Sequence, residues 1–206
     1  MKFYDTAGFP NPRRVRIALA EKGATDKVET IQVDLLSGEH RTPKFCAMNP
    51  DASVPFIELD DGTVISQCTA IIEYLDGEFG GEPLTGRTAK ERAVIHMMNH
   101  RAAAGLMDAG ATYFHHATPG LGPNLETYQN EEWGLKQKEL AQKTMRYLDS
   151  VLVDQPFIAG ERFSMADITA IAGVDFAEFA QIEIPENLNN LARWRERIHA
   201  RPGCVA

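Results

Sequence analysis

Two short motifs in the first third of the chain could together bind a small peptide that carries a carboxylate. Val54-Pro55 precedes a short apolar run, and a proline suits the first residue of a strand and can follow a cis peptide bond. The backbone N–H and C=O of Val54 could then pair with an extended ligand as an added strand would. Gln67-Cys68 opens a helical stretch, and a helix start offers N–H groups and a partial positive charge to an anion.

The elements that must position these motifs follow a mixed order of strands and helices. Strands are predicted at residues 2–5, 28–33, 56–59 and 63–65 from their apolar patterning, with a tight turn at Asp60-Asp61-Gly62 between the last two. Helices are predicted at 10–23, where Gly23 would cap the end, and at about 67–77. The stretch 40–48 is irregular or briefly helical. The order βαβ and then ββα is that of a thioredoxin-like domain.

The rest of the chain predicts only helices. Gly and Pro cluster at residues 80–86, where the periodicity stops. Helices are expected at about 87–116, at 125–153 after a Pro- and Gly-rich loop, from Ser164 onward and, as the last, at 188–199. Ser164-x-x-Asp167 has the spacing of a capping box, which favours a structural role for Asp167. The fold class is therefore α/β plus all-α: a thioredoxin-like domain at 1–79, a linker at 80–86 and an all-helical bundle domain at 87–206.

The chain resembles the cytosolic glutathione transferases over almost its whole length. Four motifs in the family's order carry the resemblance: RVRIALAEKG at 14–23, NPDASVPFIELDDG at 49–62 leading into QCTAI at 67–71, FIAG at 157–160 with FSMADI at 163–168, and Arg201-Pro202. The resemblance implies that the first domain binds glutathione and that the helical domain lines the pocket for a hydrophobic electrophile. It also implies a homodimer.

This resemblance places the residue that activates the glutathione thiol just after the first strand or at the start of the first helix. The family uses Tyr, Ser or Cys there, but residues 5–12 hold none of these, and Phe3 rather than Tyr4 matches the tyrosine position. Asn11 matches an asparagine of bacterial branches, and its amide can donate to a thiolate; alternatively it only caps the helix. Thr6 is a second candidate, or a turn residue.

The same resemblance assigns the remaining contacts to glutathione. Gln67 would bond the γ-glutamyl portion, and Cys68 stands where the family has Ser. Its thiol is a poor donor, although its backbone N–H remains; it could form a mixed disulfide with glutathione or simply be a small buried residue. His40 and Ser53 match positions at the glycine end, where His40 could instead be a lone surface histidine. Val54 and Pro55 supply the strand-like pairing.

The composition argues against several other classes of protein. The net charge of −8 opposes nucleic-acid binding, which depends on Lys and Arg. The three cysteines form no C-x-x-C, so neither a metal nor a protein dithiol is expected. No apolar run approaches the ~18 residues of a membrane span. The N-terminus lacks the apolar core of a signal peptide, and with the odd number of cysteines this predicts a cytoplasmic protein.

Three functions remain open from the sequence. The sequence favours the first, a transferase that holds glutathione as a thiolate for attack on an electrophile. The alternatives are a glutathione-dependent disulfide reductase, since bacterial relatives with Asn in this place use glutathione itself as the redox thiol, and a non-catalytic binding protein. Tyr113, Phe114 and His115-His116 could line the second pocket. Adjacent histidines diverge on a helix, so they are not expected to bind a metal.

Overall fold

The structure is a computed structural model that describes residues 1–205. It divides into two compact units, residues 1–84 and residues 85–205. The division falls inside the Gly- and Pro-rich stretch at 80–86. Within residues 1–205, no helix combines the length and the apolar character needed to cross a bilayer.

A four-stranded sheet forms the centre of the first unit. It contains β1 (Lys2–Asp5), β2 (Glu29–Gln32), β3 (Phe56–Glu58) and β4 (Val64–Ser66), in the order β2-β1-β3-β4. β1 is parallel to β2 and antiparallel to β3, and β3 and β4 form the expected antiparallel hairpin. A parallel pair with a helical crossover, followed by a hairpin, is the predicted thioredoxin-like arrangement, which is confirmed.

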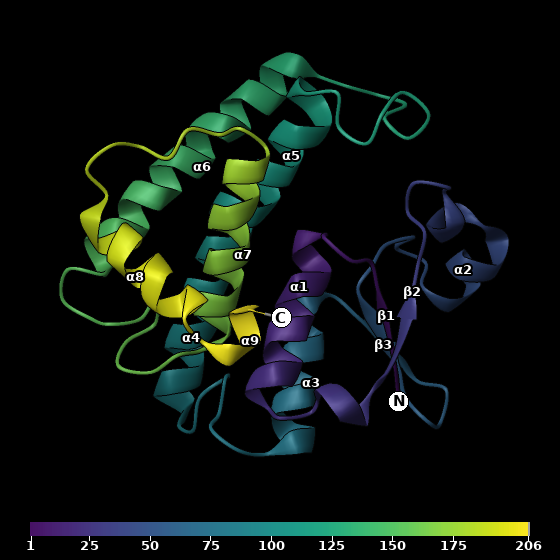
Figure 1. Ribbon diagram of the computed structural model, residues 1–206, viewed down its shortest axis with the longest axis horizontal. Coiled ribbons are helices and arrows are strands. Elements are labelled where there is room, and N and C mark those ends of the chain that lie inside the picture. Colours follow the sequence, from purple (N-terminus) through teal and green to yellow (C-terminus); the bar gives the residue numbers. More distant parts are fainter. Residues whose placement is uncertain (206) are drawn as a thin grey trace. The chain divides into compact units, whose positions relative to one another are not determined.

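Helices cover the two faces of this sheet. α1 (Pro10–Glu21) and α3 (Cys68–Phe79) pack against each other on one side, and the short α2 (Pro43–Met48) lies on the other (Figure 1). Two 3-10 turns, η1 (Thr25–Lys27) and η2 (Glu39–Arg41), complete the unit. Phe56 packs with Phe45 of α2 and with Tyr4, whereas its neighbour Ile57 is buried and directed to the opposite face by strand alternation.

A buried lysine joins the ends of α1 and α3. Lys22 caps the C-terminus of α1, and Gly23 follows with φ +58, in the position where left-handed glycines commonly end helices. The Lys22 amine forms an ion pair with Asp76 and donates to the carbonyls of Gly80 at 2.6 Å and Glu82 at 3.0 Å. A buried charge needs such partners, and these bonds fix the course of the chain as it leaves α3.

The second unit begins with one long helical run, as predicted. α4 (Ala89–Ala102) passes through a π-helical segment, η3 (Ala103–Met107), into α5 (Asp108–Ala117). Thr88 and Glu91 form a capping box at its start. In the π-helical segment, a Cβ at Gly105 would lie 2.5 Å from the Thr144 hydroxyl oxygen. Glycine therefore permits the close approach of the neighbouring helix.

That neighbour, α6 (Glu131–Val151), begins six residues later than predicted. Asn130 caps it by accepting the Trp133 N–H at 3.0 Å. The residues before it are held in the loop instead, because Gln129 donates to the carbonyls of His115 and Thr118. Trp133 is 52% exposed and is therefore not a core residue.

α7 (Met165–Phe179) lies at the centre of the second unit. The predicted capping box at its start is confirmed, with Ser164 and Asp167 bonded reciprocally. The helix is buried nearly all round. α8 (Asn189–His199) follows, but it is not the last helix, because the short α9 (Pro202–Val205) comes after it.

Candidate functional site

The starts of α1 and α3 bring two of the predicted site residues together. The thiol of Cys68, the first residue of α3, lies 3.4 Å from the backbone carbonyl of Asn11 and 3.9 Å from the Asn11 side-chain oxygen. Cys68 is 7% exposed. Residues 57 positions apart in the chain therefore share one corner of the thioredoxin-like unit.

Asn11 presents an amide donor at this corner. The alternative that it caps α1 is wrong, because the cap is Phe9, which makes no side-chain capping bond, and Asn11 lies inside the helix. Its Oδ1 accepts from Arg14 Nη1 at 3.1 Å. A guanidinium can only donate, so this bond orients the amide with Nδ2 on the other side. Within residues 1–205, no hydrogen bond involves that Nδ2.

Two other hydroxyls near the end of β1 already donate hydrogen bonds within the protein. Thr6 donates to the carbonyl of Val33 at 2.8 Å, so its proton stabilises the turn. Tyr4 donates to Glu58 at 2.8 Å and stacks on Phe56 with ring centroids 4.0 Å apart. Burial, followed by the bond to Glu58, raises the pKa of Tyr4 to about 12. Of these residues, Asn11 alone keeps a donor available to a bound thiolate.

The loop between β1 and α1 is held by side chains from neighbouring elements. Asp5 is buried at the end of β1 and accepts from Arg16 of α1 and, at 3.0 Å, from Gln32 of β2. The amide oxygen of Gln32 accepts the backbone N–H of Ala7 at 3.1 Å. These bonds fix the segment that leads into the first turn of α1, and with it the position of Asn11.

The loop before β3 holds the predicted strand-like pairing element. The Val54–Pro55 peptide bond is cis. In the described part of the chain, no hydrogen bond reaches the backbone N–H or C=O of Val54. The amide of Asn49, which is fully buried, donates to the carbonyl of Ser53 at 2.8 Å and holds this loop in place.

Gln67 adopts an unusual backbone conformation just before α3. Its φ is +70°, a left-handed value that costs free energy for a residue with a Cβ and is often found at functional sites. Its side-chain amide donates to Asp51 at 2.9 Å, and the Ser66 hydroxyl donates to the same Asp51 oxygen at 3.2 Å. Asp51 was not among the residues predicted for the site, because an acid in the loop before the Val-Pro motif is its only signal in the sequence.

His40 is a buried histidine rather than the lone surface histidine that the sequence left open. It lies in η2 and is 8% exposed, and its Nδ1 has no hydrogen-bond partner among residues 1–205. Burial, and then the charge of Arg41, lowers the pKa of the imidazole. At neutral pH it is therefore uncharged, and its unpaired Nδ1 is itself buried.

The lowered pKa of His40 predicts a pH-dependent stability. The unfolded chain binds the proton more readily, so the contribution of neutral His40 is complete above about pH 6.5 and is lost as the pH falls below that value. We expect the stability of the wild type to fall more steeply between about pH 7 and pH 5 than that of His40→Gln, measured by urea denaturation. His100→Gln, at an exposed histidine, should keep the wild-type slope. Equal slopes for His40→Gln and the wild type would contradict the prediction.

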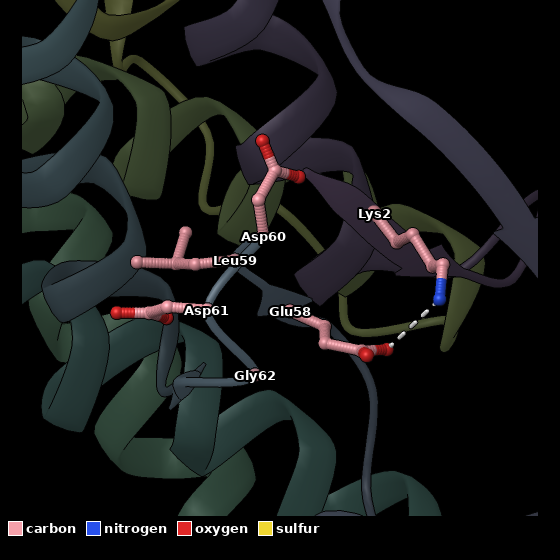
Figure 2. Close-up of a pocket in the computed structure, with 6 residues that line it drawn as sticks. All are labelled: Lys2, Glu58, Leu59, Asp60, Asp61 and Gly62. Carbon is pink, nitrogen blue, oxygen red and sulfur yellow. Dashed lines mark ion pairs between the residues drawn. The ribbon is translucent and has the colours of Figure 1, made fainter.

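A pocket at the β3–β4 hairpin is a different feature. It is lined by Lys2 and by residues 58–62, and Figure 2 shows Lys2 paired with Glu58 while Asp60 and Asp61 leave the turn in different directions. Its three carboxylates outnumber the amine of Lys2 and the N-terminal amine that pairs with Asp60, so the pocket is acidic. It therefore does not suit the carboxylate ends of a peptide ligand, unlike the start of α3.

The second unit carries an aromatic cluster. Phe114 of α5 contacts Phe176 and Phe179 of α7 edge-on or tilted, and Phe179 is 69% exposed. His115 pairs with Glu126 at 2.7 Å, and His116 accepts the Asn130 N–H at 3.0 Å. In the part of the chain that the structure describes, no group of three or more His, Cys, Asp or Glu residues is placed to hold a metal.

Fold and site together define a thioredoxin-like protein with a candidate site for a thiol peptide. The chain belongs to the glutathione S-transferase family. Family models for the "Glutathione S-transferase, N-terminal domain" and "C-terminal domain" match residues 10–78 and 102–202.

Individual relatives match along nearly the full chain. "Glutathione S-transferase 2" of Saccharomyces cerevisiae is 52% identical over 202 residues, which are 98% of this chain and 87% of the yeast protein. Among solved structures, a glutathione S-transferase domain-containing protein of Marinobacter aquaeolei is 64% identical with a TM-score of 0.98, covering 99% of this chain and 100% of that one. Gtt2 of Saccharomyces cerevisiae is 51% identical with a TM-score of 0.97, covering 100% and 99%.

Proposed function

We propose that this protein is a glutathione transferase that binds glutathione as a thiolate and conjugates it to an electrophilic small molecule. The observation that carries the proposal is the available amide donor of Asn11 in the first turn of α1, beside the start of α3. A donor there supports thiolate formation without a Tyr, Ser or Cys. Membership of the glutathione S-transferase family supports glutathione as the thiol.

The required stabilisation of the thiolate is modest. A free thiol has a pKa of about 8.5, so only a few per cent is ionised at neutral pH. Lowering that pKa by about 2 units needs about 2.7 kcal/mol. One amide hydrogen bond to the thiolate and the positive end of α1 can together supply this amount. The thiol proton passes to solvent, and the sulfur lone pair then forms the new C–S bond. In a substitution the leaving group departs with the electrons of its bond to carbon. In an addition the π electrons of the unsaturated electrophile move away from the attacked carbon, and the resulting anion takes up a proton from solvent.

The geometry of the first unit supports the proposed contacts along glutathione. The uncharged His40 and Ser53 serve its glycine end, and the unpaired backbone of Val54, ahead of Pro55, pairs with its cysteinyl residue as a strand would. Gln67 and the backbone N–H of Cys68 serve its γ-glutamyl end. The buried Cys68 thiol acts as a small packing residue here. Thr6, whose proton bonds Val33, is the weaker candidate for thiol activation.

We assign each of the two domains a part in this function. Residues 1–79 form the glutathione-binding domain, residues 80–86 the linker and residues 87–206 the helical domain, whose aromatic side chains supply the apolar surface for a hydrophobic electrophile. The partly exposed ring of Phe179 supports this role. A cytoplasmic detoxification role is consistent with three cysteines that form no disulfide.

We also expect a homodimer. The second unit exposes several large apolar side chains, among them Met97, Leu140 and Tyr147, and burying such side chains between copies is favourable. Light scattering behind size exclusion should give twice the 22.8 kDa of one chain. A mass of one chain across the working concentration range would contradict this.

Glutathione binding by calorimetry, combined with a pH titration of thiolate absorbance in the complex, tests the proposed function. We expect saturable binding and a thiolate pKa well below about 8.5, together with conjugation of a model aromatic electrophile. An unshifted pKa with reduction of a small disulfide would instead favour the disulfide reductase. Binding without turnover of either substrate would favour a binding protein, and no binding at all would refute the proposal.

A further inference from the structure

We propose that Asp51 selects the amino-acid end of glutathione by accepting its ammonium group. The inference rests on the proposed function and adds a specificity-determining residue to it. Its consequence is that one subunit recognises both charges of the γ-glutamyl head, the carboxylate at the start of α3 and the ammonium at Asp51.

The Asp51 carboxylate is bonded on one oxygen only. Oδ2 accepts from both the Ser66 hydroxyl, at 3.2 Å, and the Gln67 amide, at 2.9 Å. For Oδ1, the structure of residues 1–205 contains no hydrogen bond. Asp51 is exposed, so this oxygen remains accessible to a ligand bound at the start of α3.

The same bond changes what Gln67 can offer. Because its NH₂ group donates to Asp51, the side chain turns its donor toward the protein and keeps its Oε1 as an acceptor. Gln67 also makes no capping bond to the first turn of α3, where backbone N–H groups have no acceptor within the helix. Donors suited to a carboxylate thus lie beside two acceptors suited to an ammonium, and an α-amino acid carries those two groups on one carbon.

Backbone contacts hold Asp51 in this place before any ligand binds. Its N–H donates to the side-chain oxygen of Asn49 at 3.3 Å, and the amide of that buried asparagine donates to the Ser53 carbonyl. Ala52 between them has a left-handed φ of +48°. A preorganised carboxylate loses little freedom on binding, which favours affinity.

Charge explains why this residue would discriminate between ligands. An anion bound at the start of α3 is repelled by a neighbouring carboxylate, unless the ligand brings its own positive charge to that carboxylate. Glutathione does so through its α-ammonium. A peptide with a glutaryl group in place of the γ-glutamyl group keeps the carboxylate and loses the ammonium, so Asp51 should repel it.

The test compares glutathione with N-glutaryl-cysteinyl-glycine by calorimetry on the full-length protein. We expect the wild type to prefer glutathione by about tenfold or more, the range of a charge-assisted hydrogen bond. Asp51→Asn should weaken glutathione binding about tenfold and reduce the preference to within about threefold. Asp51→Glu should retain most of the preference. Asp26→Asn, which removes the same charge from an exposed site on the same unit, should behave as the wild type.

The outcomes distinguish a failure of the Asp51 proposal from a failure of the proposed transferase function. If the wild type binds glutathione and Asp51→Asn keeps its full preference, Asp51 does not contact the ammonium and the inference fails while the transferase stands. Tighter glutathione binding by Asp51→Asn would mean that Asp51 only repels the substrate carboxylate, which also overturns it. If the wild type binds neither peptide, the proposed function itself fails. Thermal melts of each variant confirm that the fold is intact.

Discussion

Asp167→Ala should lower the free energy of unfolding by about 4 kcal/mol. The carboxylate is fully buried and accepts the backbone N–H of Ile158, the N–H and hydroxyl of Ser164, and the indole N–H of Trp194, all within 3.1 Å. Removing it leaves these buried donors without an acceptor, and each such loss costs about 1–3 kcal/mol. Urea denaturation measures the effect.

Milder variants keep this expectation testable if Asp167→Ala fails to fold. Asp167→Asn retains the shape and one acceptor, and should lose about 2 kcal/mol. Asp154→Ala, at an exposed acid in the same unit, should change the stability by less than about 0.5 kcal/mol. A loss of under about 1 kcal/mol for Asp167→Ala would show that solvent or rearranged side chains satisfy the four donors.

Asn11→Ala should reduce kcat/KM for conjugation by about 10- to 100-fold. A hydrogen bond to a charged group contributes about 1.5–3 kcal/mol, and the lost donor stabilises the thiolate in preference to the thiol. The thiolate pKa of bound glutathione should therefore rise by about 1–2 units, so the loss of activity should shrink as the pH is raised. Ultraviolet titration of the complex and rate measurements over the same pH range follow both effects.

Matched variants distinguish a role of Asn11 as a hydrogen-bond donor from a role in packing. Asn11→Ser returns a hydroxyl donor and should recover part of the lost rate, whereas Asn124→Ala, at an exposed asparagine of the second unit, should leave both quantities unchanged. Arg14 holds the amide through its Oδ1, so Arg14→Met should act in the same direction as Asn11→Ala but more weakly. An unchanged thiolate pKa in Asn11→Ala would assign Asn11 a purely structural role.

Local patterns determined most of the secondary structure. The alternation at residues 2–5, the Ser164-x-x-Asp167 spacing and the glycine after Lys22 each act through bonds within a few residues, so they can be read from the sequence. The start of α6 was missed because the side chain of Gln129 bonds to carbonyls more than ten residues away and holds the preceding loop out of the helix. The exposure of Trp133 likewise depends on how α6 packs against the rest of the second unit.

By itself, the sequence determined the order of elements, the two-part organisation and the types of residue available to the site. The tertiary structure decided which of those residues share a corner and which of their atoms remain available. It brought Asn11 beside Cys68, used the Thr6 proton on Val33, buried His40 and paired Gln67 with Asp51. The physical reason is that the hydrogen-bond partners of these side chains lie far away in the sequence. Only the packing of the sheet and its helices brings those partners within hydrogen-bond distance, and this determines which donors remain available.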